Sequence, residues 1–536
     1  MKNNKWENVM VKYLNNNTSG FQQWNAAREA NTKKSRLGGI LWWFILFIAS
    51  WWLLSWWMTP NTTKTDVIDT KIETVDVSGV PTSEISSENL TATVQGLRIS
   101  DVKLLDYAAD ASNDESGPVV LLGADGAYAL VGMIANGIDV PTQTTVWEQN
   151  GDTYSWRNSD GVEFNRKITV DGYVISVNDT IKNNTSDAIA IAPYAEILRA
   201  NDMESSAGVY SGSVAYVNSD LEHEDWPRIA DKSYAYSTDS GFIGFVDQYW
   251  ETVLSIASPD QTMRVKPLGD MFMADAAAAA VQIAPGTDAT ITTNLYMGPR
   301  DHRILQSADA IISGLDETVD YGWFWFFVRP ILWLLHILNS VVMNYGVAII
   351  IMTLLLRLAM WPLTRKSYTS MAAMQKMQPE MARIQKLYAN DRARMQMEMM
   401  RLYQTHKTSP MSGCLPMLIQ IPIFFALYKA LLISVQMRGA HFLWISDLAS
   451  MDPYFILPIL MGATMWLQQY MQSASTPKSD AKKDDPVAQT QRMMKWMPLL
   501  FTVMFAWMPA GLVLYWTISN IFGLGQMYYI KKVTRN

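Results

Sequence analysis

The 536-residue sequence predicts an α-helical membrane protein with six transmembrane helices and a large external antiparallel β-sandwich domain. Long apolar runs lie near the beginning and in the last third of the chain. The region between them consists of short, β-branched stretches separated by turn residues. Acidic and basic residues are also separated along the sequence. Because only 49% of the residues are hydrophobic overall, it is this clustering that predicts membrane helices.

The first apolar run covers residues 37–58 and contains no charged residue. About 20 apolar residues cross a bilayer as a helix. A cleaved secretory signal has an apolar stretch of only about 7–15 residues and a small-residue cleavage site, which we do not find here. We therefore expect a retained transmembrane signal anchor, preceded by a basic cytoplasmic tail at residues 1–36.

Charge is distributed unevenly. Residues 60–320 contain 40 of the 50 Asp and Glu residues but only 15 of the 43 Lys and Arg residues. That segment carries a net charge of −25, and the remainder of the chain carries +18. Since short basic flanks remain in the cytoplasm, we expect the N-terminus inside and residues 60–320 outside.

The external region should fold by means of strands. We expect a polar linker at 59–89 and a β-sandwich domain at 90–320, in which Asp171-Gly172 joins two alternating runs as a hairpin. The Ala-rich run 276–281 fits either a short helix or a strand. The single cysteine, Cys414, excludes an internal disulfide, so this domain depends on its own core.

Residues 323–339 are apolar enough to cross a membrane, but we expect an amphipathic helix lying in the outer interface, with Arg329, His336 and Asn339 on its polar side. If this segment crossed, the basic segment 365–412 would be external, against the cytoplasmic bias of Lys and Arg.

The other transmembrane helices are expected at 344–363, 415–435, 454–471, 497–511 and 512–530, with cytoplasmic segments at 472–495 and 531–536.

The segment 365–412 has the pattern of a cytoplasmic helical hairpin. Met371, Met374, Met377 and Met381 repeat at steps of three and four, and a second such pattern begins at Met395. We expect a methionine-lined seam and basic outer faces. The methionines serve either as ordinary core or as an adaptable surface for apolar segments. The basic residues proposed to contact partners are Arg383, Lys386, Arg392, Arg394 and Arg401.

Several long motifs within residues 318–530 resemble the YidC family of bacterial inner-membrane protein insertases, which has mitochondrial and chloroplast relatives. They include YGVAIIIMTLLLRLAMWPLT, GCLPMLIQIPIFFALYKAL and KWMPLLFTVMFAWMPAGLVLYWTISN. For residues 60–317 the resemblance rests on size, β texture and the sequence LYMGPRDHRIL. It implies that five of the six helices form an insertase core and that the sandwich is periplasmic. Two features depart from the family: the basic tail is long, and Tyr515-Trp516 stands where two tyrosines are common.

Arg357 is a permanent charge in an otherwise apolar span, with Thr353 one turn away. Burying a guanidinium in hydrocarbon costs at least about 2.5–3.5 kcal/mol, so either it snorkels to the cytoplasmic surface or it lines a hydrated pocket. The resemblance implies the second, a hydrophilic groove open to cytosol and lipid. Its residues would be Arg357, Thr353, Gln420, Tyr515, Trp516 and Ser519.

The implied function is insertion and folding of nascent membrane proteins, alone or with the Sec translocon. The ribosome and anionic lipids are further expected partners, without specific recognition of nucleic acid. We expect no enzyme activity, cofactor or metal site, since there is no phosphate-binding loop and His223 and His302 are isolated. A transporter or channel is the main alternative, although the spans contain no Asp or Glu. A carbohydrate enzyme is the second alternative, and it would need paired carboxylates within residues 90–300.

Overall fold

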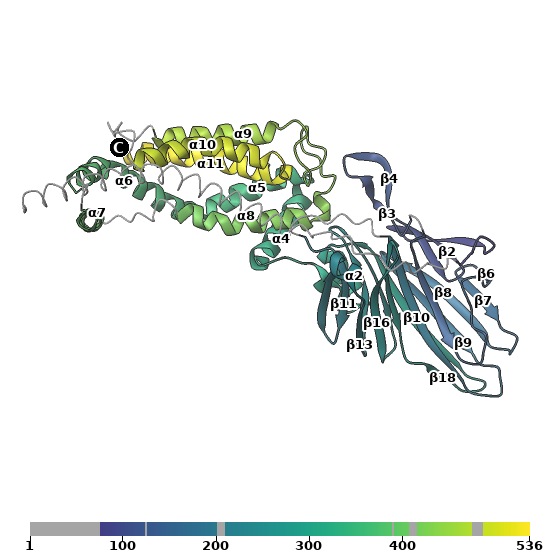
Figure 1. Ribbon diagram of the computed structural model, residues 1–536. Coiled ribbons are helices and arrows are strands. Elements are labelled where there is room, and N and C mark those ends of the chain that lie inside the picture. The colour runs from purple at the N-terminus through teal and green to yellow at the C-terminus, as the bar shows by residue number, and fades with distance from the viewer. Residues whose placement is uncertain are drawn as a thin grey trace, which may run out of the picture. The chain divides into compact units, whose positions relative to one another are not determined.

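A computed structural model describes residues 75–123, 126–200, 209–388, 391–406, 415–473 and 486–535. Within these ranges a β-sandwich comes first along the chain and is followed by a set of long helices (Figure 1). The expected basic tail 1–36, the signal anchor 37–58 and the first part of the linker lie outside the described residues.

Two antiparallel sheets form the sandwich, so this part of the predicted fold class is confirmed. Their strand orders are β1-β2-β3-β5-β10-β17-β16-β13, with β4 beside β3 and β18 beside β10, and β12-β11-β14-β15-β19-β9-β8-β7-β6. The strands of the first sheet are β1 (Thr82–Ser86), β2 (Leu90–Gln95), β3 (Arg98–Asp110), β4 (Asn113–Leu121), β5 (Tyr128–Ala135), β10 (Ile189–Ala200), β13 (Tyr234–Thr238), β16 (Gln261–Leu268), β17 (Met271–Ala277) and β18 (Val281–Ile283). Those of the second are β6 (Glu148–Asn150), β7 (Thr153–Arg157), β8 (Glu163–Asp171), β9 (Val174–Lys182), β11 (Gly212–Val217), β12 (Asp220–Asp225), β14 (Gly241–Val246), β15 (Trp250–Ile256) and β19 (Asp288–Pro299).

Alternating apolar residues explain how the sheets pack. In β9, Ile175, Val177 and Ile181 are buried because side chains on a strand alternate between its two faces. The predicted hairpin joins β8 and β9, and Gly172 at its tip has φ +56°, a conformation that favours glycine. The undecided run 276–281 contributes no helix: it contains the end of β17 and the first residue of β18.

Arg300 fastens the end of the sandwich to the segment that leaves it. After β19 the chain forms α3 (His302–Ala308) and the 3₁₀ turn η1 (Leu315–Thr318). The buried guanidinium of Arg300 donates to the carbonyl oxygens of Thr318, Tyr210 and Asp247. Thr318 in turn donates its hydroxyl to Glu251 at 2.8 Å. The exit segment is therefore held against the sandwich by buried hydrogen bonds.

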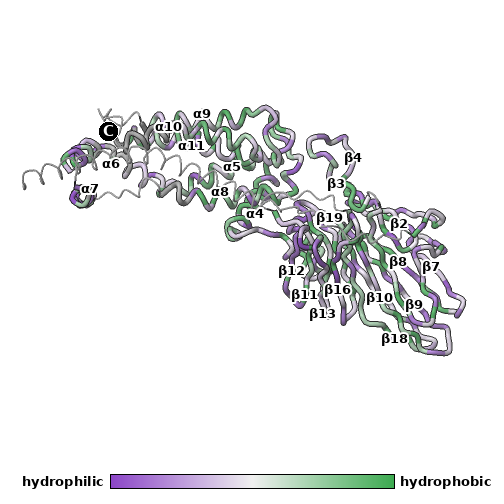
Figure 2. Tube along the Cα trace, in the orientation of Figure 1, coloured by the Kyte–Doolittle hydropathy of each residue, from purple (hydrophilic) through white to green (hydrophobic). Residues whose placement is uncertain are grey.

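Most of the helices that follow are apolar along much of their length, whereas α6, α7 and many strands of the sandwich carry more hydrophilic residues (Figure 2). An Asn344 side chain caps the start of α5, and Asp391 caps α7. The helices are α4 (Trp325–Val342), α5 (Tyr345–Ala359), α6 (Trp361–Leu387), α7 (Arg392–Thr405), α8 (Leu415–Ile433), α9 (Ile456–Ser473), α10 (Pro486–Phe505) and α11 (Ala510–Arg535), with the short α2 (Trp226–Asp231) in the sandwich and the 3₁₀ turn η3 (Val435–Met437) after α8.

A sharp bend separates α5 from α6. The two helices meet at 59°, at a break beside Pro362, which occupies the first turn of α6. Proline has no N–H to donate, and its ring clashes with the carbonyl four residues earlier, here that of Leu358, which explains why α5 does not continue through Pro362. The bend lies just after Arg357, in the last turn of α5.

By length and composition, only α4 among the described helices contains an 18-residue stretch apolar enough to cross a membrane. The pair formed by α5 and residues Trp361–Ser370 also passes as a bent unit, and Gln420–Ile433 and Trp496–Phe505 are shorter apolar helices. The count of six transmembrane helices stays a prediction from the sequence.

Three expectations about boundaries and faces are wrong. The linker 59–89 contains strand β1, a polar edge strand that pairs with β2 and lacks the apolar alternation that marks a strand in sequence. The loop 472–495 contains the first ten residues of α10, whose polar start resembles a loop. On α4, Arg329 is exposed, but His336 and Asn339 turn toward packed neighbours.

Candidate functional site

Arg357 lies half-buried in the last turn of α5 and contacts α11. Its Nε donates to the hydroxyl oxygen of Ser519 at 2.7 Å, and Nη2 donates to the same oxygen. Ser519 itself is 2% exposed. Tyr368 and Tyr515 lie close enough to interact electrostatically with the guanidinium. The structure thus solvates a permanent charge with hydroxyl groups from two other helices.

A second hydrogen bond extends this polar cluster. The Gln420 amide on α8 donates to the hydroxyl of Tyr515 on α11. Tyr515 is 3% exposed, and it lies one helical turn from Ser519, so both project from the same side of α11. Four of the six predicted groove residues are therefore brought together: Arg357, Gln420, Tyr515 and Ser519.

The remaining two predicted groove residues lie in different surroundings. Thr353 is fully buried and donates its hydroxyl to the Ile349 carbonyl at 2.6 Å, so its polar group is satisfied within its own helix. Trp516 packs among aromatic rings, with its centroid 5.2 Å from those of Phe424 and Phe505. These two residues therefore pack beside the polar cluster, and their own contacts are with Ile349 and with aromatic rings.

A further polar row lies between α11, α9 and α6. Asn520 donates to Thr464 at 3.3 Å, and Gln468 donates to Tyr368 at 3.4 Å. Gln526 is 2% exposed, yet neither of its side-chain amide atoms has a hydrogen-bond partner in the described part of the chain. Tyr368 was missed in the sequence because it follows the bend. Gln526 had a usable signal, since it lies seven residues after Ser519 on an otherwise apolar face.

The cluster has no acidic member. Within the described ranges, no Asp or Glu oxygen lies within 4 Å of the Arg357 guanidinium. None of the helices α5, α8, α9, α10 and α11 contains an acidic residue. Within the described residues, the charge of Arg357 is therefore met by hydroxyl groups and not by a carboxylate.

Lys429 on α8 is another cation within an apolar helix. Its ammonium lies 2.7 Å from the Asp320 carboxylate, which precedes α4. Burial alone raises the pKa of Asp320, but the charge and hydrogen bond of Lys429, the Gly322 N–H and Arg300 outweigh it, so that this pKa is lowered. The pair therefore ties α8 to the exit segment of the sandwich.

Other contacts join the sandwich to the segment around η3. The Arg438 guanidinium donates to the Ala108 and Ala109 carbonyls, each at 2.6 Å, at the end of β3. Gln436 donates to Asp301 at 2.7 Å, and Gln248 donates to the Leu432 carbonyl at 2.9 Å. Long-range hydrogen bonds thus connect the sandwich with the end of α8.

The loop between α8 and α9 is stabilised by two buried carboxylates. Asp447 accepts from the Gly439 and Ala449 N–H groups, at 3.1 and 2.9 Å. Asp452 is 1% exposed and accepts from the Trp444 indole and from backbone N–H groups before and within α9. These acidic residues therefore act as structural caps in an ordered loop.

The predicted basic hairpin is formed by α6 and α7. Four of its basic side chains are exposed, namely Arg383, Lys386, Arg394 and Arg401. The Arg392 side chain lies outside the described side chains. Met377 is 3% exposed, and Met374, Met381, Met395 and Met399 are half-buried, as a seam requires. Leu387, the last residue of α6, is 69% exposed.

One carboxylate pair in the sandwich bears on the carbohydrate-enzyme alternative. Glu196 and Asp275 are cross-strand partners on β10 and β17, and both are buried. Tyr128 and Tyr194 donate to Glu196, and Arg264 donates to Asp275 at 2.8 Å. Glu196 is therefore engaged by tyrosine hydroxyls and Asp275 by basic side chains, as expected of structural groups rather than of a free acid and base.

Comparison with known proteins gives consistent family matches. Residues 83–334 match the model of the YidC periplasmic domain, and residues 337–536 match the model of the 60Kd inner membrane protein family. The chain is 36% identical over 391 residues to the membrane protein insertase YidC of Magnetococcus marinus, covering 70% of this chain and 68% of that protein. It is 33% identical over 509 residues to the one of Rickettsia bellii, covering 86% and 89%.

Among solved structures, the chain resembles an active YidC insertase with its first transmembrane domain resolved. The two are 17% identical, and the match covers 84% of this chain and 95% of that one with a TM-score of 0.36.

Proposed function

Since the chain belongs to the YidC family of membrane protein insertases, we propose that it inserts nascent membrane proteins by receiving their polar tails at the cluster around Arg357. The observation that carries this proposal is the position of the Arg357 guanidinium, a permanent positive charge. It lies among apolar helices and is bonded to a serine hydroxyl, with no acidic residue near it in the described chain. The sandwich is the periplasmic domain of this inner-membrane protein.

The mechanism follows from solvation. A polar tail that enters hydrocarbon loses its hydration, and a charged residue there costs several kcal/mol. Hydroxyl and amide groups of Ser519, Tyr515 and Gln420 replace part of that hydration, and Arg357 attracts acidic groups of the tail. The adjoining apolar segment of the client then partitions into lipid, which provides the driving force.

Polar groups beyond the four clustered residues support a continuous hydrated path. Gln468, Tyr368 and Gln526 extend from the cluster along α9, α6 and α11. The unpaired amide of Gln526 is costly in a dry interior, and water or a client backbone would satisfy it. We include these residues in the proposed groove, and we assign Thr353 and Trp516 to its wall.

The proposed topology has six transmembrane helices, both termini in the cytoplasm and α4 in the outer interface. Its support is the division of charge and the exposed aromatic residues of α4. The bent pair α5 and α6 then carries the chain into the cytoplasm, where α6 and α7 form the hairpin.

We further propose that the exposed basic residues of the hairpin contact the ribosome or anionic lipids, and that the Sec translocon is a partner for some clients. The hairpin supports this through its exposed Arg383, Lys386, Arg394 and Arg401. Its exposed methionines Met397 and Met400 offer an adaptable apolar surface.

Site-specific crosslinking tests the proposed function. A photoreactive residue at Gln420 should crosslink to a ribosome-bound client during insertion, because this side chain faces the polar cluster. The matched control is Trp466 on α9, which is 57% exposed and lies outside the cluster. Crosslinks from position 466 to the polar tail, with none from position 420, would contradict a groove at Arg357.

A further inference from the structure

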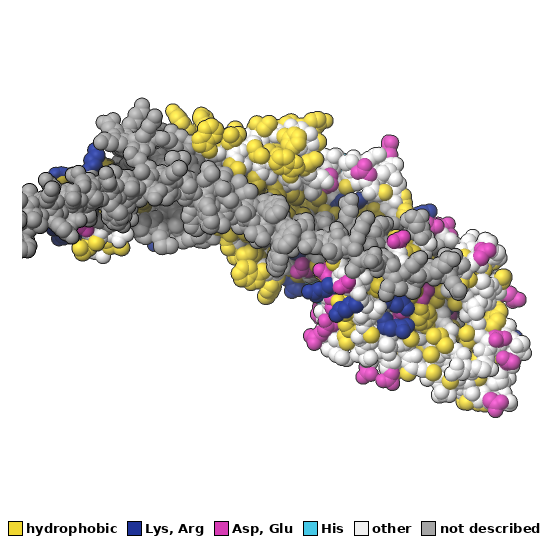
Figure 3. All heavy atoms as spheres, viewed as in Figure 1, with side chains coloured by type: hydrophobic (Ala, Val, Ile, Leu, Met, Phe, Trp, Pro, Cys, Tyr) yellow, Lys and Arg dark blue, Asp and Glu magenta, His cyan; other side chains and the backbone are white. Residues whose placement is uncertain are grey.

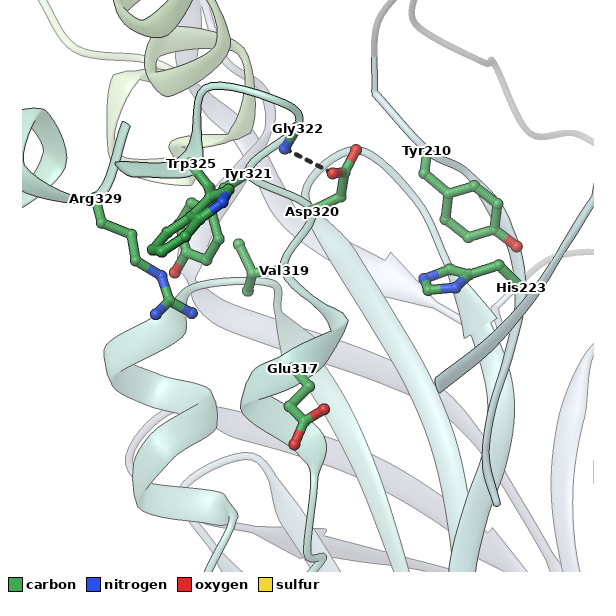
Figure 4. A pocket seen from close by; sticks show the side chains of 9 residues that line it. All are labelled: Tyr210, His223, Glu317, Val319, Asp320, Tyr321, Gly322, Trp325 and Arg329. Atoms are coloured by element: carbon green, nitrogen blue, oxygen red, sulfur yellow. Dashed lines mark hydrogen bonds between the residues drawn. The ribbon is translucent and has the colours of Figure 1, made fainter. Parts of the chain in front are cut away.

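A cavity of about 510 Å³ lies where α4 begins beside the sandwich. Its walls come from the exit segment 317–322, from Trp325 and Arg329 of α4, and from Tyr210 and His223 on the strand side (Figure 4). The volume falls within the range of about 300–1,000 Å³ that is usual for small-molecule sites. No residue of this cavity takes part in the cluster around Arg357.

Opposite charges line the cavity without neutralising each other. Arg329 lies with its guanidinium 4.7 Å above the Tyr321 ring, and within the described ranges no carboxylate oxygen is within 4 Å of it. Glu317 is exposed, and its carboxylate meets only a distant hydroxyl, that of Tyr216 at 3.5 Å. Asp320 is already used by Lys429 and the Gly322 N–H. Among the described residues, Arg329 and Glu317 therefore each lack an oppositely charged partner in the cavity.

Exposed aromatic residues at the start of α4, here called the aromatic rim, lie at the cavity or next to it in the sequence. Trp325 lines the cavity and is 55% exposed, and the neighbouring Trp323 and Phe326 are 87% and 51% exposed. Such exposure is costly in water, but tryptophan is favoured at the boundary between head groups and acyl chains. In the space-filling view, apolar side chains gather over the helical part, whereas acidic ones are scattered over the sandwich (Figure 3).

We propose that this cavity binds the head group of a zwitterionic phospholipid that carries a phosphate and a primary ammonium. Arg329 holds the phosphate through its planar fork of donors, Glu317 accepts from the ammonium, and the acyl chains lie against Trp323, Trp325 and Phe326. A polar peptide would satisfy the charges but would leave the aromatic rim in water. An amphiphile satisfies both, which is why we favour a lipid.

This lipid would join the sandwich to the interfacial helix. Glu317 belongs to the exit segment fastened by Arg300, whereas Arg329 belongs to α4. One bound head group would therefore bridge the two elements at the outer surface of the membrane. The inference uses the interfacial placement of α4, but it does not depend on the role of Arg357.

Native mass spectrometry of the full chain in detergent tests the proposal. The probes are phosphatidylethanolamine and phosphatidylglycerol with the same acyl chains, added at equal concentration. Wild-type protein should retain phosphatidylethanolamine preferentially. Arg329→Gln should lower retention of both lipids at least fivefold, because the phosphate contact is lost. Glu317→Gln should remove the preference for phosphatidylethanolamine while leaving phosphatidylglycerol unchanged, because only the ammonium contact is lost.

Arg228→Gln is the matched control, since Arg228 is an exposed sandwich arginine outside the cavity, and it should retain lipid as the wild type does. Unchanged retention of both lipids by Arg329→Gln would overturn the proposal. So would displacement of the lipid by soluble phosphoethanolamine or by an acidic peptide at equal concentration, because a free head group or a client tail would then be the occupant. Arg357→Ala should retain lipid normally, so failure of the proposed groove would be distinguishable.

Discussion

Arg300, Lys429 and Arg357 are three cations largely withdrawn from water, and each is stabilised differently. Arg300 donates to backbone carbonyls, and Lys429 pairs with Asp320. Arg357 has serine and tyrosine neighbours and, within the described chain, no acidic partner. A buried cation that is paired with a carboxylate or with several carbonyl oxygens stabilises the fold. A cation without such partners can instead attract an acidic group of a client. This contrast supports Arg357 as the functional charge.

Glu251 should make the stability of the sandwich depend on pH. Burial raises the pKa of this carboxyl from 4.5 to about 7, although Arg300 and the Thr318 hydroxyl oppose the shift. Because the folded state prefers the protonated acid, there is no penalty below pH 4.5. Stability should fall as the pH rises from 4.5 to about 7, by on the order of 3 kcal/mol in total.

Thermal unfolding of the full chain, followed by β-sheet circular dichroism at pH 5 and pH 8, measures this effect. Glu251→Gln cannot ionise, so its melting temperature should fall less between the two pH values than that of the wild type. Glu148→Gln is the control, because Glu148 lies exposed in β6. Equal pH dependence in wild type and Glu251→Gln would refute the assignment.

The sequence alone was informative about Arg357 because a permanent charge in an apolar run is conspicuous whatever its partners. It was not informative about Lys429 or Arg300. Their roles depend on Asp320, Thr318 and Tyr210, which approach them only in the folded chain. Pairing across such separations depends on tertiary structure, and no local pattern encodes it.

At the scale of elements, α9 and α10 approach closely at a glycine. A methyl group at Gly462 would overlap the Thr502 hydroxyl, whereas one at Gly525 on α11 would meet nothing within 4 Å. Overpacking of this kind costs about 1–3 kcal/mol. Gly462→Ala should therefore lower the thermal stability of the detergent-solubilised protein, and Thr502→Ala should restore part of it. Gly525→Ala is the control, and an equal loss in both alanine variants would speak against the packing described here.

The hairpin α6–α7 should bind anionic partners through charge. Replacing Arg383, Lys386, Arg394 and Arg401 by Glu should weaken co-sedimentation with ribosomes or anionic vesicles, since each basic residue near an anionic surface contributes about 1 kcal/mol. The difference should shrink as salt screens the interaction, over a Debye length of about 10 Å at 0.1 M. Replacing the three arginines by Lys keeps the charge and should preserve binding. Full binding by the Glu variant at low salt would exclude this role.

Elements with an apolar face were predictable, and those without one were not. Strands β8 and β9 and their turn at Gly172 were predicted because alternation and Asp-Gly coincide there. β1 was missed because an edge strand with mostly polar residues resembles a linker. The start of α10 was missed for the same reason, because its apolar residues begin only near Trp496.

For the whole molecule, the contacts between sandwich and helices argue for a joined architecture. Arg438, Gln436 and Lys429 each contact the sandwich or its exit segment. A deletion of the sandwich that preserves α4 and the outer loop therefore tests whether the sandwich takes part in insertion. An insertion defect in such a deletion would give the sandwich a direct part in the activity.

Single-cysteine labelling tests the proposed topology. After Cys414→Ser, a membrane-impermeant reagent should label Ser240→Cys on the sandwich from the outside. Gln396→Cys on α7 should react only after the membrane is permeabilised. Both positions are exposed, so accessibility of the side chain does not limit labelling. Labelling of position 396 from the outside would place the hairpin and the sandwich on the same side of the membrane. The chain would then have to cross the membrane an even number of times between them, which contradicts the proposed topology.

The central claim is that Arg357 receives the polar tail of a client, and insertion of matched clients tests it most directly. Two clients should differ only in whether the translocated tail is acidic or neutral. They should be inserted by wild type, Arg357→Lys and Arg357→Ala present at equal levels in the membrane. Arg357→Ala should lose insertion of the acidic client most, whereas Arg357→Lys should retain much of it because the charge remains. Undiminished insertion of both clients by Arg357→Ala would contradict the claim.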